Sequence, residues 1–143
     1  MRRPSLQSIA LVAAGLPALG IGLAIAVAPR AFYAGYGIAL DPDPSLLSEL
    51  RAPGAALATL GATILAGLAR PAMARASLAL GALVFFAYAA GRFIGLALDG
   101  PPAGGMIEAT AIELAIGALC VVVLRRRPAA AVFGGEARLL EAG

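Results

Sequence analysis

The sequence predicts an all-α integral membrane protein, a bundle of four membrane-spanning helices. Of its 143 residues, 61% are hydrophobic and only 13% are charged, whereas about a quarter of the residues of a soluble domain carry charge. The mean hydropathy is +0.91. The apolar residues gather into four segments, each of the roughly 20 residues that a helix needs to cross the hydrocarbon of a bilayer.

The first expected span covers residues 9–28 and ends before Pro29. Its basic start and the small residues at its end are similar to a secretory signal peptide. The apolar run of about 20 residues is longer than the roughly 7–15 residues of a signal peptide's hydrophobic region. We therefore expect this segment to remain as the first helix.

The second expected span covers residues 44–69. It begins with Asp43 and Pro44, because Asp is favoured as a helix N-cap and Pro at the first helical position. The third expected span covers residues 73–98 and ends at the helix-stopping turn Asp99-Gly100-Pro101-Pro102.

The fourth expected span covers residues 105–124 and stops at three arginines before Pro128. The chain is thus expected to form a single four-span domain over residues 1–128, followed by a short cytoplasmic tail at residues 129–143.

The arginines predict the orientation. Those at the two termini and between the second and third spans all fall on one side of a four-span protein: Arg2, Arg3, Arg70, Arg75, Arg125, Arg126 and Arg127. The positive-inside rule then places both termini in the cytoplasm. The loop at residues 29–43 faces outward, and its Phe32, Tyr33 and Tyr36 suit the interface of the membrane. A composition rich in Ala, Gly and Arg favours a bacterial inner membrane as the location.

Small residues recur at helical spacing and predict close helix packing, because small side chains mark helix contacts in lipid. The expected contact faces are Ala14, Ala18, Gly22 and Ala26 in the first span, Gly54, Ala58 and Ala62 in the second, Ala87, Gly91 and Gly95 in the third, and Ala109 and Gly117 around Glu113 in the fourth.

Three charged residues lie inside these apolar segments. Arg51, Arg92 and Glu113 each lie seven residues from the outer end of their helix, which is roughly 10 Å into the membrane at 1.5 Å per residue. Such residues are costly in lipid and usually pair, line a cavity or carry function. We expect Arg92 to pair with Glu113, since their helices are joined by a short loop.

The sequence therefore predicts an outward-opening polar pocket. Its expected lining is Glu49, Arg51, Arg92 and Glu113, with Tyr88 and Glu108 as further candidates for ligand binding. Pro53 cannot donate to the carbonyl of Glu49, so a bend is expected there. The alternative for each charge is a structural role, either in an ion pair that fixes helix register or, for Glu108, at the membrane surface.

Several functions are excluded or disfavoured. The chain has no His and one cysteine, Cys120, within an apolar run, so we expect neither a metal site nor a bound cofactor, and Cys120 is expected in the core. The motifs of serine hydrolases, nucleotide-binding loops and zinc proteases are absent. The basic residues flank apolar segments, which argues against a nucleic-acid partner.

Four short motifs resemble an uncharacterised family of small four-span bacterial membrane proteins grouped with the DoxX-like proteins. They are Glu49-Leu50-Arg51-Ala52, Gly91-Arg92, Asp99-Gly100-Pro101-Pro102 and Glu113-Leu114. The resemblance implies a four-helix fold and no assigned activity. This chain departs from the family pattern at Pro53-Gly54-Ala55, where an aromatic residue and paired glycines are usual.

Three hypotheses of function follow. The first is that the pocket binds or passes a small amphiphilic or lipid-like molecule whose polar head is held by Arg, which binds oxygen acids through a planar fork. The second is a membrane enzyme of the isomerase or epoxide-opening type, with Glu49 or Glu113 as acid or base. The third is a structural subunit. The expected partners are the lipid bilayer and a small ligand, with a second copy or another membrane protein as alternatives.

Overall fold

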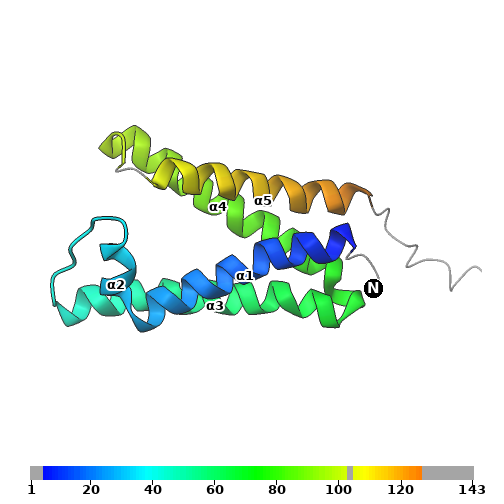
Figure 1. The fold of residues 1–143 in the computed structure, drawn as a ribbon, viewed down its shortest axis with the longest axis horizontal. Coiled ribbons are helices and arrows are strands. Elements are labelled where there is room, and N and C mark those ends of the chain that lie inside the picture. Colours follow the sequence, from blue (N-terminus) through cyan, green and yellow to red (C-terminus); the bar gives the residue numbers. More distant parts are fainter. Residues whose placement is uncertain (1–4, 103–104, 127–143) are drawn as a thin grey trace, which may run out of the picture.

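The structure is a computed structural model that describes residues 5–102 and 105–126. The predicted tail at 129–143 and the arginines at 2, 3 and 127 lie outside the described residues. The elements are α1 (Leu6–Val27), α2 (Pro29–Ala34), α3 (Pro44–Ala69), the 3-10 turn η1 (Pro71–Met73), α4 (Ala74–Asp99) and α5 (Met106–Arg126) (Figure 1).

The described residues contain no strand. Four helical segments in them are long and apolar enough to cross a membrane: Leu6–Val27, Pro44–Ala69, Pro71–Asp99 and Met106–Arg126. The predicted all-α fold with four membrane-spanning helices is therefore confirmed. The short α2, which follows α1 directly, was not expected from the sequence.

Side-chain caps set where the helices begin. The hydroxyl of Ser5 accepts a hydrogen bond from the backbone N–H of Ser8 at 3.1 Å, so α1 starts earlier than hydropathy alone suggests. At the start of α3, Asp43 Oδ1 accepts from the N–H groups of Ser45 at 2.6 Å and Leu46 at 3.0 Å. These hydrogen bonds to the ionised carboxylate lower the pKa of Asp43 below its ordinary value of 3.8.

The α1–α3 hairpin is held at close range by glycines. A Cβ atom placed on Gly22 of α1 would lie only 2.7 Å from the carbonyl oxygen of Gly54 on α3. A Cβ on Gly61 of α3 would lie 2.7 Å from Cα of Leu19 on α1. Larger residues at these positions would force the helices apart, as expected for helix packing in lipid.

The contact face of α3 differs from the predicted one at a single position. Gly54 and Ala58 are buried as expected, but Ala62 is exposed and Gly61 is buried in its place. An α-helix has 3.6 residues per turn, so a stripe at every fourth residue rotates away from a straight partner. The face returns to that partner at the seventh residue after Gly54 rather than the eighth.

The second hairpin, α4 and α5, meets the first at a compact crossing. A Cβ on Gly81 of α4 would lie 3.1 Å from Cβ of Ala14 on α1 and 3.2 Å from Sγ of Cys120 on α5. Cys120 is fully buried, which confirms it as a core residue. Nearby, the buried hydroxyl of Ser77 donates to the carbonyl of Thr63 at 3.2 Å and joins α4 to α3.

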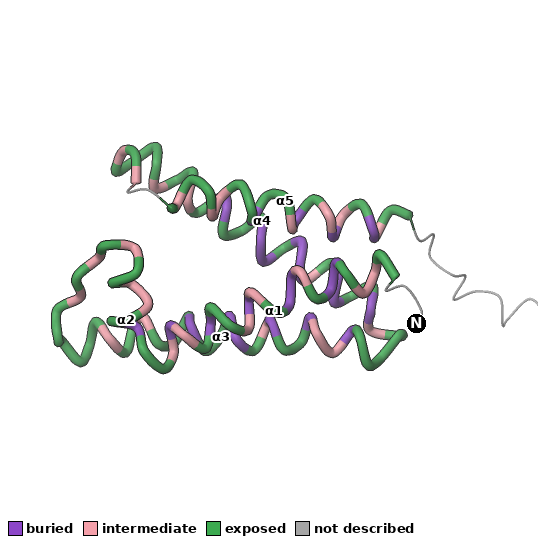
Figure 2. The backbone as a smooth tube through the Cα atoms, in the orientation of Figure 1, coloured by how far each residue is buried: buried purple, intermediate pink, exposed green. Residues whose placement is uncertain are grey.

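The two hairpins diverge towards the end of the molecule that carries α2 (Figure 1). Buried residues follow α1 and α3, whereas residues 90–99 at the end of α4 are all exposed or half-buried (Figure 2). The predicted packing face at Ala87, Gly91 and Gly95 is therefore wrong, because Ala87 and Gly91 are exposed and Gly95 is only half-buried. Among the described residues, a Cβ on Gly91 would meet no atom within 4 Å, and one on Gly95 would meet only the Asp99 side chain of its own helix. Because α4 leaves the first hairpin here, no helix backbone fills this face.

Candidate functional site

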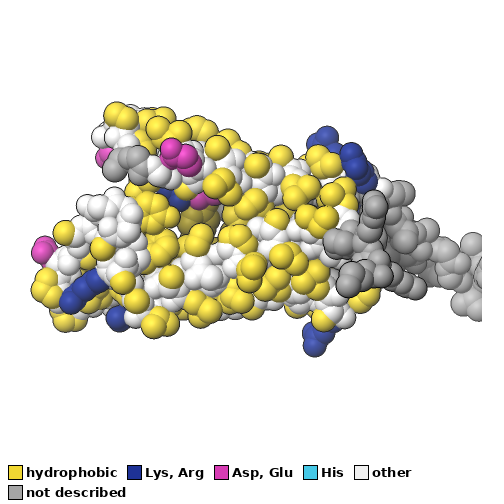
Figure 3. Space-filling view, in the orientation of Figure 1, with side chains coloured by type: hydrophobic (Ala, Val, Ile, Leu, Met, Phe, Trp, Pro, Cys, Tyr) yellow, Lys and Arg dark blue, Asp and Glu magenta, His cyan; other side chains and the backbone are white. Residues whose placement is uncertain are grey.

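A cavity of about 670 Å³ lies where the hairpins diverge. In the space-filling view it is a hollow between the hairpins, with apolar walls and charged side chains at its edge (Figure 3). Most of its lining is apolar and comes from α1, α4 and α5, with one residue from α3. These apolar residues include Pro17, Ala18, Ile21, Ile25, Leu57, Val84, Phe85, Met106, Ile112 and Ile116.

The short helix α2 and the turn after it line one side of the cavity with aromatic rings. Phe32 lies at the centre of this group, 5.3 Å from the ring of Tyr33 in an edge-on arrangement and 5.5 Å from the ring of Tyr36. All three residues line the cavity. Sequence reasoning assigned them to the membrane interface and missed their place in the site. The signal was Pro29, which is favoured at the first position of a helix and here begins α2.

Tyr88 of α4, a candidate for ligand binding from the sequence, also lines the cavity. With Tyr33 and Tyr36 it completes the set of three tyrosines in the chain. Tyrosine combines an apolar ring with a hydroxyl that can donate or accept a hydrogen bond. The cavity wall therefore carries polar hydroxyls on an otherwise apolar surface.

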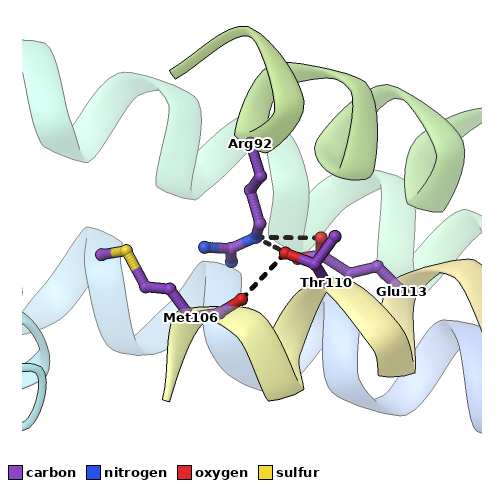
Figure 4. Close-up of polar contacts among 4 residues, drawn as sticks. All are labelled: Arg92, Met106, Thr110 and Glu113. Carbon is purple, nitrogen blue, oxygen red and sulfur yellow. Dashed lines mark hydrogen bonds and ion pairs between the residues drawn. The ribbon is translucent and has the colours of Figure 1, made fainter. Parts of the chain in front are cut away.

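The charged part of the cavity is an ion pair between α4 and α5. The Nε–H of Arg92 donates to both carboxylate oxygens of Glu113, at 3.0 Å and 2.9 Å (Figure 4). The pair predicted between these residues is confirmed. It is placed by the register of the hairpin, since Glu113 shares the buried face of α5 with Gly117 and Cys120. The Glu113 side chain is 11% exposed, and that of Arg92 is 29% exposed.

Arg92 uses only part of its donor capacity. Among the residues that the structure describes, its two terminal guanidinium nitrogens make no hydrogen bond. Figure 4 shows them directed away from Glu113, on the side of Met106. The neighbouring hydroxyl of Thr110 donates to the carbonyl of Met106 at 2.8 Å, and no hydrogen bond joins it to Arg92 among the described residues. The cavity is therefore lined by N–H donors with no acceptor from the described protein.

Arg51 does not join this cavity. Its Nε–H donates to the carbonyl of Ala26 at 3.2 Å, near the end of α1, and it lines a separate recess beside Pro29 and Leu47. The last carbonyls of a helix lack partners within the helix, and a cation is favourable there. Arg51 thus caps a free carbonyl at the end of α1, and this hydrogen bond explains its position without a ligand.

Glu49 and Glu108 are exposed and line neither recess. Glu49 projects from a different side of α3 than Arg51, and α3 continues as one helix through Pro53. Glu108 lies in the first turn of α5, where a negative charge is favourable. The predicted pocket of four charges is therefore not formed as expected, because only Arg92 and Glu113 meet in the cavity.

The arrangement suits binding better than proton transfer. Both oxygens of Glu113 accept from Arg92. The other two candidate carboxylates, those of Glu49 and Glu108, are exposed and do not line the cavity. Within the described residues there is no group of three side chains that could hold a metal ion. What the cavity offers a ligand is an apolar volume with the N–H donors of Arg92 at one position and tyrosines in its wall.

Comparisons with known proteins give one match. The family described as "Domain of unknown function (DUF4345)" matches residues 6–124, a stretch that includes all the residues lining the cavity. No curated protein and no solved structure matches the chain significantly.

Proposed function

The chain belongs to the DUF4345 family of domains of unknown function, and we propose that it binds a small amphiphilic, lipid-like molecule in the cavity between its two helical hairpins. Ligand sites are typically concave, mostly apolar and supplied with a few convergent polar groups. The cavity of about 670 Å³ has this composition. Its volume is within the range of about 300–1,000 Å³ typical of small-molecule sites.

The observation that carries the proposal is that the two terminal nitrogens of Arg92 make no hydrogen bond among the described residues. Charged side chains in spanning helices are rare and mark functional sites or pairs. Arg–carboxylate pairs frequently form two parallel hydrogen bonds from two guanidinium nitrogens. Here a single Nε–H contacts both oxygens of Glu113, and the terminal nitrogens remain available for a ligand's polar head.

The rest of the cavity accommodates an apolar body. Side chains such as Ile21, Ile25, Val84 and Ile112 line it on facing helices. A hydrocarbon or ring system between the hairpins would fill this volume and make van der Waals contacts with these side chains. The aromatic residues of α2 and the turn after it line one side of the same volume.

We further propose that the cavity opens towards the outer face of a bacterial inner membrane, with both termini in the cytoplasm. The support is the charge distribution. Arg70 and Arg75 lie at the connection of α3 and α4, and Arg125 and Arg126 end α5, at the opposite end of the molecule from α2 (Figures 1 and 3). The positive-inside rule places these arginines in the cytoplasm. A relationship to the DoxX-like proteins is proposed from the sequence motifs alone.

Native mass spectrometry tests ligand binding. Wild-type protein purified from its membrane in detergent is expected to retain a lipid-like mass that Arg92→Gln loses. Arg30→Gln is the matched control, because it removes the same charge at an exposed position outside the cavity, and it should retain the mass. Circular dichroism would establish that each variant is folded.

Two results would contradict the proposal. One is a wild-type protein that carries no bound mass either in detergent or in nanodiscs supplied with lipids from the native membrane. The other is a mass retained equally by folded Arg92→Gln. A loss of stability without any bound molecule would favour a structural role for the pair.

A further inference from the structure

The charge balance of the cavity limits the kind of head group that fits. Arg92 and Glu113 lie in direct contact, and together they carry no net charge. The other ionisable side chains lining the cavity are tyrosines, which are neutral at neutral pH. In the part of the chain that the structure describes, the cavity lining therefore has no net charge while Arg92 presents N–H donors.

An anionic head group would disturb that balance. A carboxylate or phosphate beside Arg92 would also lie close to Glu113 and would leave a net negative charge among apolar side chains. Charge in a poorly solvated site is strongly unfavourable unless it is paired. The only cation lining the cavity, within the described chain, already has a carboxylate partner.

An uncharged oxygen acceptor avoids this difficulty. A carbonyl oxygen can accept from the terminal nitrogens of Arg92, which have no partner among the described residues, and it adds no charge. Hydrogen bonds to a charged donor are stronger than those between neutral groups. A pure hydrocarbon would leave these donors without an acceptor inside an apolar cavity.

From this geometry we infer that the ligand is an uncharged apolar molecule with a hydrogen-bond-accepting oxygen, such as an ester or a ketone, rather than an anionic lipid. The inference rests on the proposed function of the cavity and specifies its ligand class. It makes Glu113 the residue that determines specificity, because the carboxylate cancels the charge that would otherwise attract anions.

Three probes with matched chains test the inference: methyl laurate, laurate at alkaline pH and dodecane. Binding to the full-length protein in nanodiscs would be compared by native mass spectrometry at equal probe content. Wild type should bind methyl laurate at least about tenfold more tightly than either of the others, the effect of one hydrogen bond to a charged group.

Glu113→Gln should reverse the preference between ester and anion, because Arg92 then carries an unbalanced positive charge. Arg92→Gln, a second variant, should abolish the preference of the ester over dodecane. Arg30→Gln should behave as wild type. The wild-type comparison stands by itself if a cavity variant fails to fold.

The outcomes separate two failures. Wild type that binds laurate as well as methyl laurate would overturn the neutral-head inference and leave the proposed binding function intact. A folded Glu113→Gln protein that keeps the wild-type preference would also overturn it. Binding of none of the three probes would overturn both proposals.

Discussion

Arg92 contacts Glu113 through one nitrogen, and the two partners are unequally buried. The Nε atom lies 2.9 Å from Oε2, while the side chain of Glu113 is 11% exposed and that of Arg92 is 29% exposed. The carboxylate depends on the arginine more than the arginine depends on the carboxylate. The consequences of removing each partner should therefore differ.

Arg92→Gln should lower the free energy of unfolding more than Glu113→Gln. The first leaves a mostly buried carboxylate without its cation, at a cost of about 2–3 kcal/mol, and the second leaves a more accessible cation, at about 1–2 kcal/mol. The double variant should lose less than the sum of the two. Reversible denaturation in mixed micelles would measure all three. If the two single variants lost equal free energy of unfolding, and the double variant lost their sum, the unequal dependence of the two partners would be contradicted.

Gly22→Ala should destabilise the protein by about 1–3 kcal/mol, the range for inserting an atom into a filled contact. The added Cβ would lie 2.7 Å from the carbonyl oxygen of Gly54, so α1 and α3 must separate. Gly20→Ala is the control in the same helix, because its Cβ would meet nothing within 4 Å. Thermal unfolding should distinguish the two, and a Gly20→Ala protein as unstable as Gly22→Ala would argue against close packing at Gly22.

Arg51→Gln should lower stability modestly, by about 0.5–1.5 kcal/mol, and leave ligand binding unchanged. It removes a hydrogen bond to the carbonyl of Ala26 and a cation at a helix C-terminus, at a distance from the cavity. Unfolding and native mass spectrometry on the same preparation would test both statements. If a stable Arg51→Gln protein lost the bound molecule, Arg51 would have to be counted among the ligand-binding residues.

Stability should fall in acid through Asp43. Its folded pKa is lower than the ordinary 3.8, because the backbone N–H groups of Leu46 and Ser45 bond the ionised carboxylate. Its contribution is therefore fully present above 3.8 and is lost as the pH falls through the lower, folded value. Asp43→Asn retains a capping side chain without this titration. The difference in melting temperature between the two proteins should shrink or change sign as the pH falls below 3.8; a constant difference would exclude the effect.

The proposed orientation can be tested by cysteine labelling. In a Cys120→Ala background, Ala39→Cys places a thiol in the exposed loop before α3, and Ala72→Cys places one in the exposed turn η1. A membrane-impermeant maleimide added to intact cells should label position 39 and not position 72. Permeabilised cells should give labelling at both positions. The reverse pattern in intact cells would show that the arginine-rich end faces outward.

Much of the fold could be predicted because it depends on local properties. Apolar length gives the spans, Asp43 and Pro44 mark the start of α3, and Gly100 with a φ of 90° ends α4. The pairing of Arg92 with Glu113 could also be predicted, since a short connection between antiparallel helices fixes which residues reach the same depth.

The composition of the site could not be predicted in full, because depth in the membrane does not determine direction around a helix bundle. Arg51 lies at a suitable depth, but it faces the end of α1. Gly91 has the spacing of a packing residue with Gly95, yet α4 departs from the first hairpin before that face can be covered. The divergence of the hairpins results from all the contacts along both of them. No single sequence motif predicts it.

The three tyrosines give the protein an optical property. The chain has no Trp, and Tyr33, Tyr36 and Tyr88 all line the cavity. Its near-ultraviolet fluorescence therefore originates from the cavity wall. Entry of any molecule that displaces solvent from these rings or bonds their hydroxyls should change the emission of the unlabelled protein, so cavity occupancy can be followed by titration without a dye or an introduced label.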